Sequence, residues 1–326
     1  EKMGNNINDG YADSNRLSDK ALLIYNDFLH SGKFLTHYKW LKNAAETYDI
    51  KLELMGNSEF LCSYGTSFDK ELIETLEKYR FILFWDKDIR LGKKFTNICK
   101  KINIPIYNNI RAIADCDDKS ATYEKIGQWN DLHDTLEQIK MIPTIVAPMT
   151  YENIGYTDMN FLDKVAEKFG FPLVIKECFG SFGMQVYMAH DMDELKKRVS
   201  DIGGKPMIFQ KFIEKSSGFD VRLQVVGDEV VAAMYRYTDD GDFRANITHG
   251  GKMKSYEPDA SEIKLATDMV KSLGLDFAGV DLLFSNGADM PADMVCEVNS
   301  NAHFKNIFEC TGVNVADEIM KYIMSH

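Results

Sequence analysis

The chain has 326 residues, 45% of them hydrophobic, and a formal net charge of −12. Length and composition are typical of a globular protein with two or three domains, and the negative charge argues against nucleic acid or an anionic membrane as the main partner. No run of about 18 apolar residues is present, and no secretory signal precedes the first predicted strand. The six cysteines are scattered without a C-x-x-C pair, which indicates reduced thiols. We therefore expect a cytoplasmic protein.

The N-terminal third predicts a tail followed by an α/β domain. Residues 1–19 are polar and rich in Asn, Asp and Ser, which favours a loosely attached arm. Between residues 20 and 113, apolar strand-like runs alternate with helical patterns, which predicts a parallel sheet with right-handed crossovers. The first β–α turn lacks a G-x-G-x-x-G fingerprint, so a dinucleotide site is not expected there. The predicted strands are 21–25, 51–55, 81–85 and 104–107.

A helical, charged region follows. Asp117 and Asp118 before Lys119 and Ser120 predict a helix start with an aspartate N-cap. A second short helix is expected over 130–140. Beyond it, strands are expected at 144–146, 173–176 and 184–189, and helices at 160–169 and 191–200.

Two of these strands flank a glycine-containing turn. Lys176 ends the first strand, and the turn consists of Gly180, Ser181, Phe182 and Gly183. Glycines let backbone N–H groups approach a ligand closely, so the segment is a candidate flap over phosphates with a phosphate-binding lysine beside it. An ordinary hairpin with a solvated lysine is the alternative.

The C-terminal half predicts strands over 206–213, 219–226 and 230–237 and helices over 258–273 and 314–324. Asp220 and Arg222 share one face of a strand. The polar loop 240–251 contains Arg244 and Asn246, and loops with this many polar groups are often functional, although a solvated surface turn has the same composition.

The segment 277–299 predicts a hairpin with a candidate metal site. Asp281 interrupts an apolar strand, and Glu297 and Asn299 share a face of the next strand. A carboxylate among aliphatic side chains is costly without a partner, and oxygen ligands on paired strands suit Mg²⁺. A hairpin whose polar residues point outward is the alternative.

The ordered set of these motifs resembles the ATP-grasp superfamily, and most closely its RimK-type carboxylate–amine (glutamate) ligases. The resemblance covers roughly residues 80–326 and extends faintly into the preceding sheet. It implies an α/β protein with α+β lobes: a parallel-sheet pre-ATP-grasp domain at 20–113, a lid lobe at 114–204 and a C-terminal lobe with the metal site at 205–326.

The resemblance also implies roles for individual residues. Contacts to the ATP phosphates fall to Lys119 and Lys176. The hinge that holds adenine is Gln210, Lys211, Phe212 and Ile213, and Asp220 faces the ribose. Arg244 and Asn246 match the family's Arg-x-Asn near the γ-phosphate, so Lys176 and Arg244 are the candidate catalytic residues. The metal ligands are Asp281, Glu297 and Asn299, which hold one or two Mg²⁺ ions or Mn²⁺ as a substitute.

The implied reaction joins a carboxylate to an amine through an acyl phosphate formed from ATP, with small-molecule or peptide substrates and no nucleic acid or membrane partner. A homo-oligomer is common in the family. Two alternatives stay open: a nucleotide-binding sensor without catalysis, and a peptide-modifying enzyme that forms lactone or lactam bonds. The segment 128–141 is longer than the family's usual link, and Lys211 stands where many relatives carry Glu. Arg222 and His303 have no assigned role.

Overall fold

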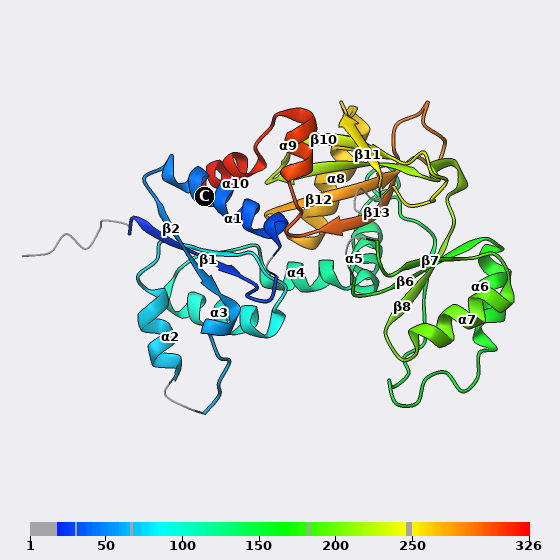
Figure 1. Cartoon of the computed structure of the whole chain (residues 1–326), viewed down its shortest axis with the longest axis horizontal. Helices are drawn as coiled ribbons and strands as arrows, with labels where there is room; N and C mark the ends of the chain where they lie inside the picture. The colour runs from blue at the N-terminus through cyan, green and yellow to red at the C-terminus, as the bar shows by residue number, and fades with distance from the viewer. Residues whose placement is uncertain (1–17, 30, 66–67, 181–182, 246–249) are drawn as a thin grey trace, which may run out of the picture.

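The computed structural model describes residues 18–29, 31–65, 68–180, 183–245 and 250–326. The described strands form three sheets, of four, five and four strands, and Figure 1 shows them following one another from the blue N-terminal region to the green region at the right. The mixed α/β architecture that the sequence predicts is confirmed. Among the described helices, none is long and apolar enough to cross a membrane.

The first sheet is parallel, as predicted, with strand order β2-β1-β3-β4. Its strands are β1 (Lys20–Tyr25), β2 (Lys51–Gly56), β3 (Ile82–Phe84) and β4 (Ile106–Tyr107). The connecting helices are α1 (Gly32–Glu46), α2 (Phe68–Leu76) and α3 (Ile89–Ile102), and a 3₁₀ turn spans Asn57–Glu59. Buried aliphatic residues of β1 alternate between the two faces, because both faces of the sheet are covered.

Two consecutive helices leave the first sheet, α4 (Ile110–Asp117) and α5 (Lys119–Leu132). The predicted N-cap is confirmed: the Asp118 carboxylate accepts a hydrogen bond from the backbone N–H of Ser120 at 2.9 Å. The predicted second helix over 130–140 is wrong. The side chain of Asn130 binds both the N–H and the C=O of Ile139, at 2.7 and 2.9 Å, and these bonds hold the chain in a non-helical turn.

The second sheet is antiparallel, with order β5-β8-β6-β7. Its strands are β5 (Thr144–Val146), β6 (Leu173–Glu177), β7 (Val186–Ala189) and β8 (Met207–Lys211). Helices α6 (Phe161–Phe169) and α7 (Met192–Ile202) cover one face, where Ile175 and Phe209 are fully buried. The other face is left for the cavity described below.

The third sheet is antiparallel, with order β11-β10-β9-β12-β13. Its strands are β9 (Phe219–Val226), β10 (Glu229–Tyr237), β11 (Lys252–Ser255), β12 (Phe277–Leu283) and β13 (Met294–Asn299), and the 3₁₀ turn Glu214–Ser216 precedes them. The hairpin predicted over 277–299 is confirmed, because β12 and β13 pair antiparallel. Helix α8 (Ala260–Leu273) covers one face, and α9 (Lys305–Thr311) and α10 (Val315–Ser325) follow the last strand.

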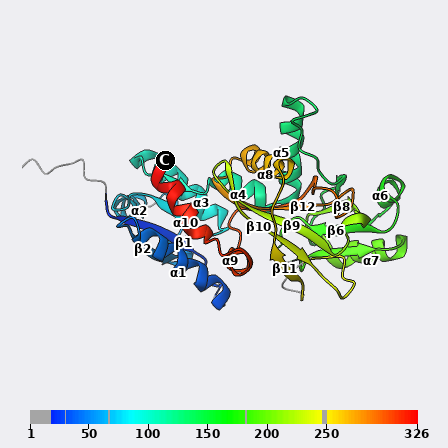
Figure 2. The ribbon, with the colours of Figure 1, turned by 90° about the horizontal axis from the view of Figure 1, so that it is seen from above.

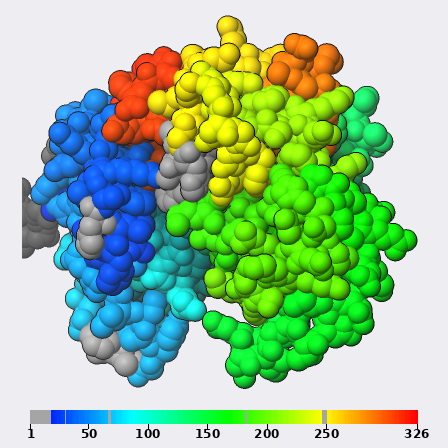
Figure 3. All heavy atoms as spheres, turned by 45° about the vertical axis from the view of Figure 1, so that its right-hand side comes forward, coloured from blue at the N-terminus to red at the C-terminus, as the bar shows by residue number. Residues whose placement is uncertain are grey.

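The first and third sheets are locked together by the fully buried Asn108. Its side-chain amide donates to the carbonyls of Phe277 and Ser300 at 2.9 and 2.8 Å, and its side-chain oxygen accepts from the N–H groups of Asp276 and Phe277. Trp85 stacks on Phe277 nearby. In Figure 2 the red α10 lies over the N-terminal region, where it packs against α1. In Figure 3 the blue and green regions face each other below the yellow strands.

Candidate active site

A cavity of about 520 Å³ lies where the three sheets meet. Eleven of the residues singled out in the sequence line it: Lys176, Gly183, Gln210, Lys211, Phe212, Ile213, Asp220, Arg244, Asp281, Glu297 and Asn299. Lys119 contacts the lining residue Glu297, and it donates to the backbone carbonyl of Gly180. Ser181, Phe182 and Asn246 lie outside the described residues. Among the eleven, Lys176 and Asn299 are farthest apart in the chain, by 123 positions, and they share one cavity.

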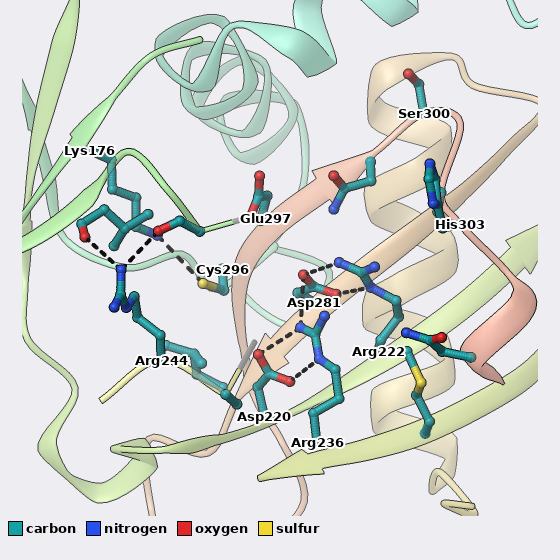
Figure 4. Close-up of a pocket in the computed structure, with 18 of the residues that line it drawn as sticks. Lys176, Asp220, Arg222, Arg236, Arg244, Asp281, Cys296, Glu297, Ser300 and His303 are labelled. Atoms are coloured by element: carbon teal, nitrogen blue, oxygen red, sulfur yellow. Dashed lines mark hydrogen bonds and ion pairs between the residues drawn. The ribbon is translucent and has the colours of Figure 1, made fainter. Parts of the chain in front are cut away.

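The candidate metal ligands share one face of the β12–β13 hairpin. Asp281 pairs directly with Glu297, and Asn299 pairs with Gly279, two residues before Asp281. Cross-strand partners and residues two apart project to the same side of a sheet. Asp281 is 4% exposed, so its carboxylate lies deep in the wall. Figure 4 shows Asp281 and Glu297 projecting from neighbouring strands.

Asp281 belongs to a row of alternating charges on β9, β10 and β12. The register places Arg222 opposite Asp281 and Arg236 opposite Asp220. Arg222 donates to both oxygens of Asp281 at 2.6 Å, Arg236 donates to both oxygens of Asp220 at 2.6 and 2.7 Å, and Arg236 reaches Asp281 at 3.0 Å. The two carboxylates and two guanidinium groups cancel in charge (Figure 4).

This charge balance keeps Asp281 ionised. Burial raises the pKa of a carboxyl group, but the guanidinium groups of Arg222 and Arg236 outweigh it and hold the pKa of Asp281 below its ordinary value. An ionised carboxylate has about four lone-pair sites, so arginine donors leave capacity for a cation. Two carboxylates and one amide oxygen match the donor set that Mg²⁺ takes. The residues present therefore fit the ion.

The two candidate phosphate lysines approach the hairpin from other elements. Lys176, at the end of β6, lies 3.6 Å from the sulfur of Cys296, and Lys119, at the start of α5, lies 3.5 Å from a Glu297 oxygen. Burial opposes the charge of Lys176, but Cys296, Tyr123 and Glu297 outweigh burial and raise the pKa of Lys176 above its ordinary value. Lys176 thus keeps its positive charge at neutral pH, as a phosphate ligand must.

Arg244 connects its loop to the glycine turn after β6. Its guanidinium group binds the carboxylate of Asp242 at 2.8 Å and donates to the carbonyl of Gly183 at 3.0 Å. The side chain therefore spans the cavity from the loop that follows β10 to the edge of the predicted flap, as Figure 4 shows beside Lys176. It can neutralise an anion bound beneath.

The predicted hinge also lines the cavity, on the strand β8 that pairs with β6. Gln210 is 1% exposed and donates to the Thr144 hydroxyl at 2.9 Å. Lys211, Phe212 and Ile213 follow it along the cavity wall, together with Ile142 and Val174 on neighbouring elements. A flat apolar slot bordered by backbone groups can hold an aromatic base.

Sequence reasoning missed several lining residues. Arg236 is one polar residue in an apolar strand, as Asp281 is, and the same signal could have found it. Cys296 lies in β13 directly before Glu297, and its sulfur contacts Lys176. Asp86 lies two residues beyond the carboxyl end of the parallel strand β3, and α/β proteins bind ligands at the carboxyl ends of such strands.

Comparisons with known proteins identify the class to which this fold and cavity belong, which is that of the ATP-dependent ligases. The family model of the RimK-like ATP-grasp domain matches residues 136–323. The chain belongs to this RimK-like ATP-grasp family, whose members are ATP-dependent carboxylate–amine ligases that use ATP with Mg²⁺.

Individual relatives carry the likeness further along the chain. The uncharacterized MG012 homolog of Mycoplasma pneumoniae is 29% identical over 304 residues, which cover 92% of this chain and 98% of that protein. A probable alpha-L-glutamate ligase of an Enterobacter species is 34% identical over 181 residues, 55% of this chain and 58% of that protein. The solved structure of the ATP-grasp ligase PsnB, complexed with minimal precursor, Mg and ADP, matches with a TM-score of 0.64 at 13% identity. The match covers 95% of this chain and 99% of the PsnB chain. That last likeness supports the fold.

Proposed function

We propose that the protein activates the carboxylate of an amino acid or peptide as an acyl phosphate and transfers the acyl group to an amine. The observation that carries the proposal is the convergence of Asp281, Glu297 and Asn299 with Lys176 and Arg244 in one cavity that also contains an apolar slot. The similarity to a glutamate ligase supports an amino acid, with L-glutamate as the first substrate to test. The peptide case is supported by the likeness to PsnB.

ATP binding is assigned to this cavity. Gln210 to Ile213 are inferred to hold adenine and Asp220 to face the ribose, and all of these residues line the cavity. Lys119 and Lys176 contact the phosphates, and Asn246 is assigned to the same region from its sequence motif. The inferred organisation is a pre-ATP-grasp domain at 20–113, a lid lobe at 114–204 and a metal-binding lobe at 205–326. Most of the arm expected over 1–19, residues 1–17, lies outside the described residues.

The chemistry follows from positioning and charge. A substrate carboxylate attacks the γ-phosphorus, the bond to ADP breaks, and Lys176 and Arg244 stabilise the negative charge on the transferring group. An amine then attacks the acyl carbon, and phosphate leaves. Good orientation of the reactants can lower the activation barrier by about 7–11 kcal/mol. Because the substrate carboxylate and the amine are themselves the nucleophiles, the mechanism uses no nucleophilic side chain.

Asp281, Glu297 and Asn299 would hold the metal. When bound, Mg²⁺ supplies charge neutralisation at the phosphate oxygens. Two ions, or Mn²⁺ in place of Mg²⁺, fit the same oxygen ligands. The segment that contains Gly180 and Gly183 is inferred to exclude water, because an acyl phosphate hydrolyses in its presence.

The proposed partners are limited to ATP and the two substrates. The net charge of −12 supports the absence of a nucleic-acid partner, and the scattered cysteines support a cytoplasmic location. A homo-oligomer is proposed from the family resemblance alone.

The test is product formation. Purified protein is incubated with ATP, Mg²⁺, L-glutamate and a panel of amines and peptides, and ADP and ligated products are measured by mass spectrometry. We expect ADP formation that needs both substrates and a product whose mass equals acid plus amine minus water. Tight ATP binding without turnover by any pair would instead identify a nucleotide sensor, and mass loss of water within one peptide would identify a lactone- or lactam-forming enzyme.

A further inference from the structure

We propose that Asp86 and Asn301 form the binding site for a primary ammonium group on one of the two substrates. The inference rests on the proposed function and adds what the cavity recognises at its N-terminal end. It predicts that at least one substrate is an amino acid or a peptide with a free amino group, rather than a simple carboxylic acid and an uncharged amine.

Asp86 lies buried at the cavity wall, two residues after β3 ends at Phe84. It is 6% exposed, and it lines both the main cavity and a smaller neighbouring one. One carboxylate oxygen accepts from the side-chain amide of Asn26 at 3.2 Å and from the backbone N–H of Lys87 at 2.7 Å. The other oxygen, Oδ2, is buried and has no hydrogen-bond partner among the described residues.

Asp86 differs from the other acidic residues of the cavity in its charge balance. Asp220 and Asp281 are bound by arginines, and Glu297 lies against Lys119. The ammonium group nearest in sequence, that of Lys87, is bound to Asp117 instead. In the described part of the chain, no cation pairs with Asp86.

An uncompensated buried carboxylate is unfavourable. Burial is the main reason that the pKa of Asp86 is raised above its ordinary value, and hydrogen bonds only partly offset it. A bound cation would restore the balance that arginines give the other carboxylates. The site is thus electrostatically incomplete until a ligand arrives.

Asn301 supplies a second buried acceptor and contacts the backbone of Asp86. Asn301 donates to the backbone carbonyl of Asp86 at 3.5 Å, and its side-chain oxygen is buried without a partner in the described structure. Both residues line the same cavity. Two acceptor oxygens, one of them ionised, suit a group that has three N–H donors and a positive charge, whereas a carboxylate or phosphate would be repelled.

The site is close in sequence to the candidate metal hairpin. Asn301 follows the candidate metal ligand Asn299 by two residues, and the Ser300 hydroxyl between them is another buried polar atom without a described partner. The basic residues Lys33 and Arg222 line the same cavity. A cavity lined by both acidic and basic side chains suits an amino acid, which carries an ammonium group and a carboxylate.

Binding measurements test the inference directly. Each standard L-amino acid and its desamino analogue, such as L-glutamate and glutarate, is titrated into protein saturated with AMPPNP and Mg²⁺. For the amino acid that binds, we expect Asp86→Asn to weaken affinity by about 10- to 100-fold, to leave the affinity for the desamino analogue unchanged and to leave AMPPNP binding unchanged. Asp88→Asn is the matched control, because Asp88 lines only the smaller cavity.

Stability of the ligand-free protein separates recognition from a structural role. Because Asp86 lacks a cation partner, Asp86→Asn should melt at the same temperature as the wild type or higher. Loss of stability together with unchanged discrimination between the amino acid and its analogue would overturn the inference. Wild-type protein that binds AMPPNP but no amino acid better than its desamino analogue would overturn it too.

Kinetics show which substrate carries the ammonium group. With an active pair, Asp86→Asn should raise KM for the acid alone or for the amine alone, and a loss confined to kcat would contradict recognition. Failure of wild-type protein to bind AMPPNP with Mg²⁺, or to form ADP with any pair, would count against the proposed function itself rather than against the Asp86 site.

Discussion

Arg222 holds Asp281 by two parallel hydrogen bonds of 2.6 Å, one to each carboxylate oxygen. The pairing follows from the register of β9 and β12, in which the two residues stand directly opposite each other. Arg236 reaches the same carboxylate at 3.0 Å. The orientation and charge of Asp281 are therefore fixed before ATP and metal bind. Asp281 then needs no reorganisation during the reaction.

Removing Arg236 should destabilise the protein. Arg236→Met leaves Asp220 without its two-bond partner and takes one of two guanidinium groups from Asp281. Breaking a buried pair from one side costs about 3–5 kcal/mol. Urea unfolding should show a loss of this size. Because the loss comes from an uncompensated charge, Asp220→Asn combined with Arg236→Met should recover part of it, and strictly additive losses would contradict a coupled network.

Asn108 should couple the first sheet to the metal hairpin. Asn108→Ala removes four hydrogen bonds and leaves backbone groups of Phe277 and Ser300 buried without partners. We expect a loss of about 3 kcal/mol or more in the free energy of unfolding, measured by urea titration. Asn108→Asp keeps the acceptor oxygen but turns a buried carboxylate oxygen toward the carbonyls of Phe277 and Ser300, so it should lose at least as much stability as the alanine variant. A loss well below about 1 kcal/mol in the alanine variant would contradict the coupling.

His37 should make stability depend on pH. Its Nδ1–H donates to the Lys33 carbonyl at 2.6 Å, and Nε2 accepts from the N–H groups of Phe304 and Lys305 at 3.0 and 3.3 Å. Burial lowers the pKa of His37 from 6.5 to about 4. Between pH 6.5 and 4, His37 is therefore protonated in the unfolded chain but neutral in the folded protein. The free energy of unfolding falls as the pH drops through this window.

Protonation linked to His37 should lower the free energy of unfolding by about 3 kcal/mol near pH 4. Above pH 7 this effect should vanish. Urea unfolding of the wild type and His37→Gln across pH 4–7.5 measures it as a difference, which cancels the other titrating groups. The variant should lose less stability on acidification. Parallel curves for the two proteins would rule out a titrating role for this imidazole.

Lys176 should be needed for turnover rather than for folding. Lys176→Met removes a positive charge that is 7% exposed and keeps most of the side-chain volume. We expect kcat/KM for ADP formation to fall about 100- to 1,000-fold, as when one preorganised donor to a developing charge is lost, with the melting temperature retained. Lys168→Met, on the exposed end of α6, is the control. Wild-type turnover in the Lys176 variant would remove its assigned role.

Much of the fold is predictable from local pattern. The predicted strands 144–146 and 219–226 match β5 and β9, because clean apolar runs bounded by turn residues identify strands. The aspartate N-cap before Lys119 was likewise readable. β11 was missed because three of its four residues are polar and exposed, and the single apolar residue, Met253, is too little to mark a half-buried strand.

The site was predictable in its residue types and only partly in its contacts. Asp281 stood out because a carboxylate interrupts an apolar strand. Its partners did not, since pairing with Arg222 and Arg236 depends on the register of three strands. Asp86 depends on tertiary structure in the same way: its importance lies in the lack of a cation partner, which sequence alone does not show.

The most direct test of the central claim is the metal dependence of nucleotide binding in Glu297→Gln. Calorimetry gives the Kd of AMPPNP with and without Mg²⁺ for the wild type, for this variant and for Glu309→Gln on the exposed face of α9 as a control. We predict that Mg²⁺ tightens binding at least about tenfold in the wild type and the control, and that Glu297→Gln loses this gain. An undiminished Mg²⁺ effect in Glu297→Gln would contradict the metal site.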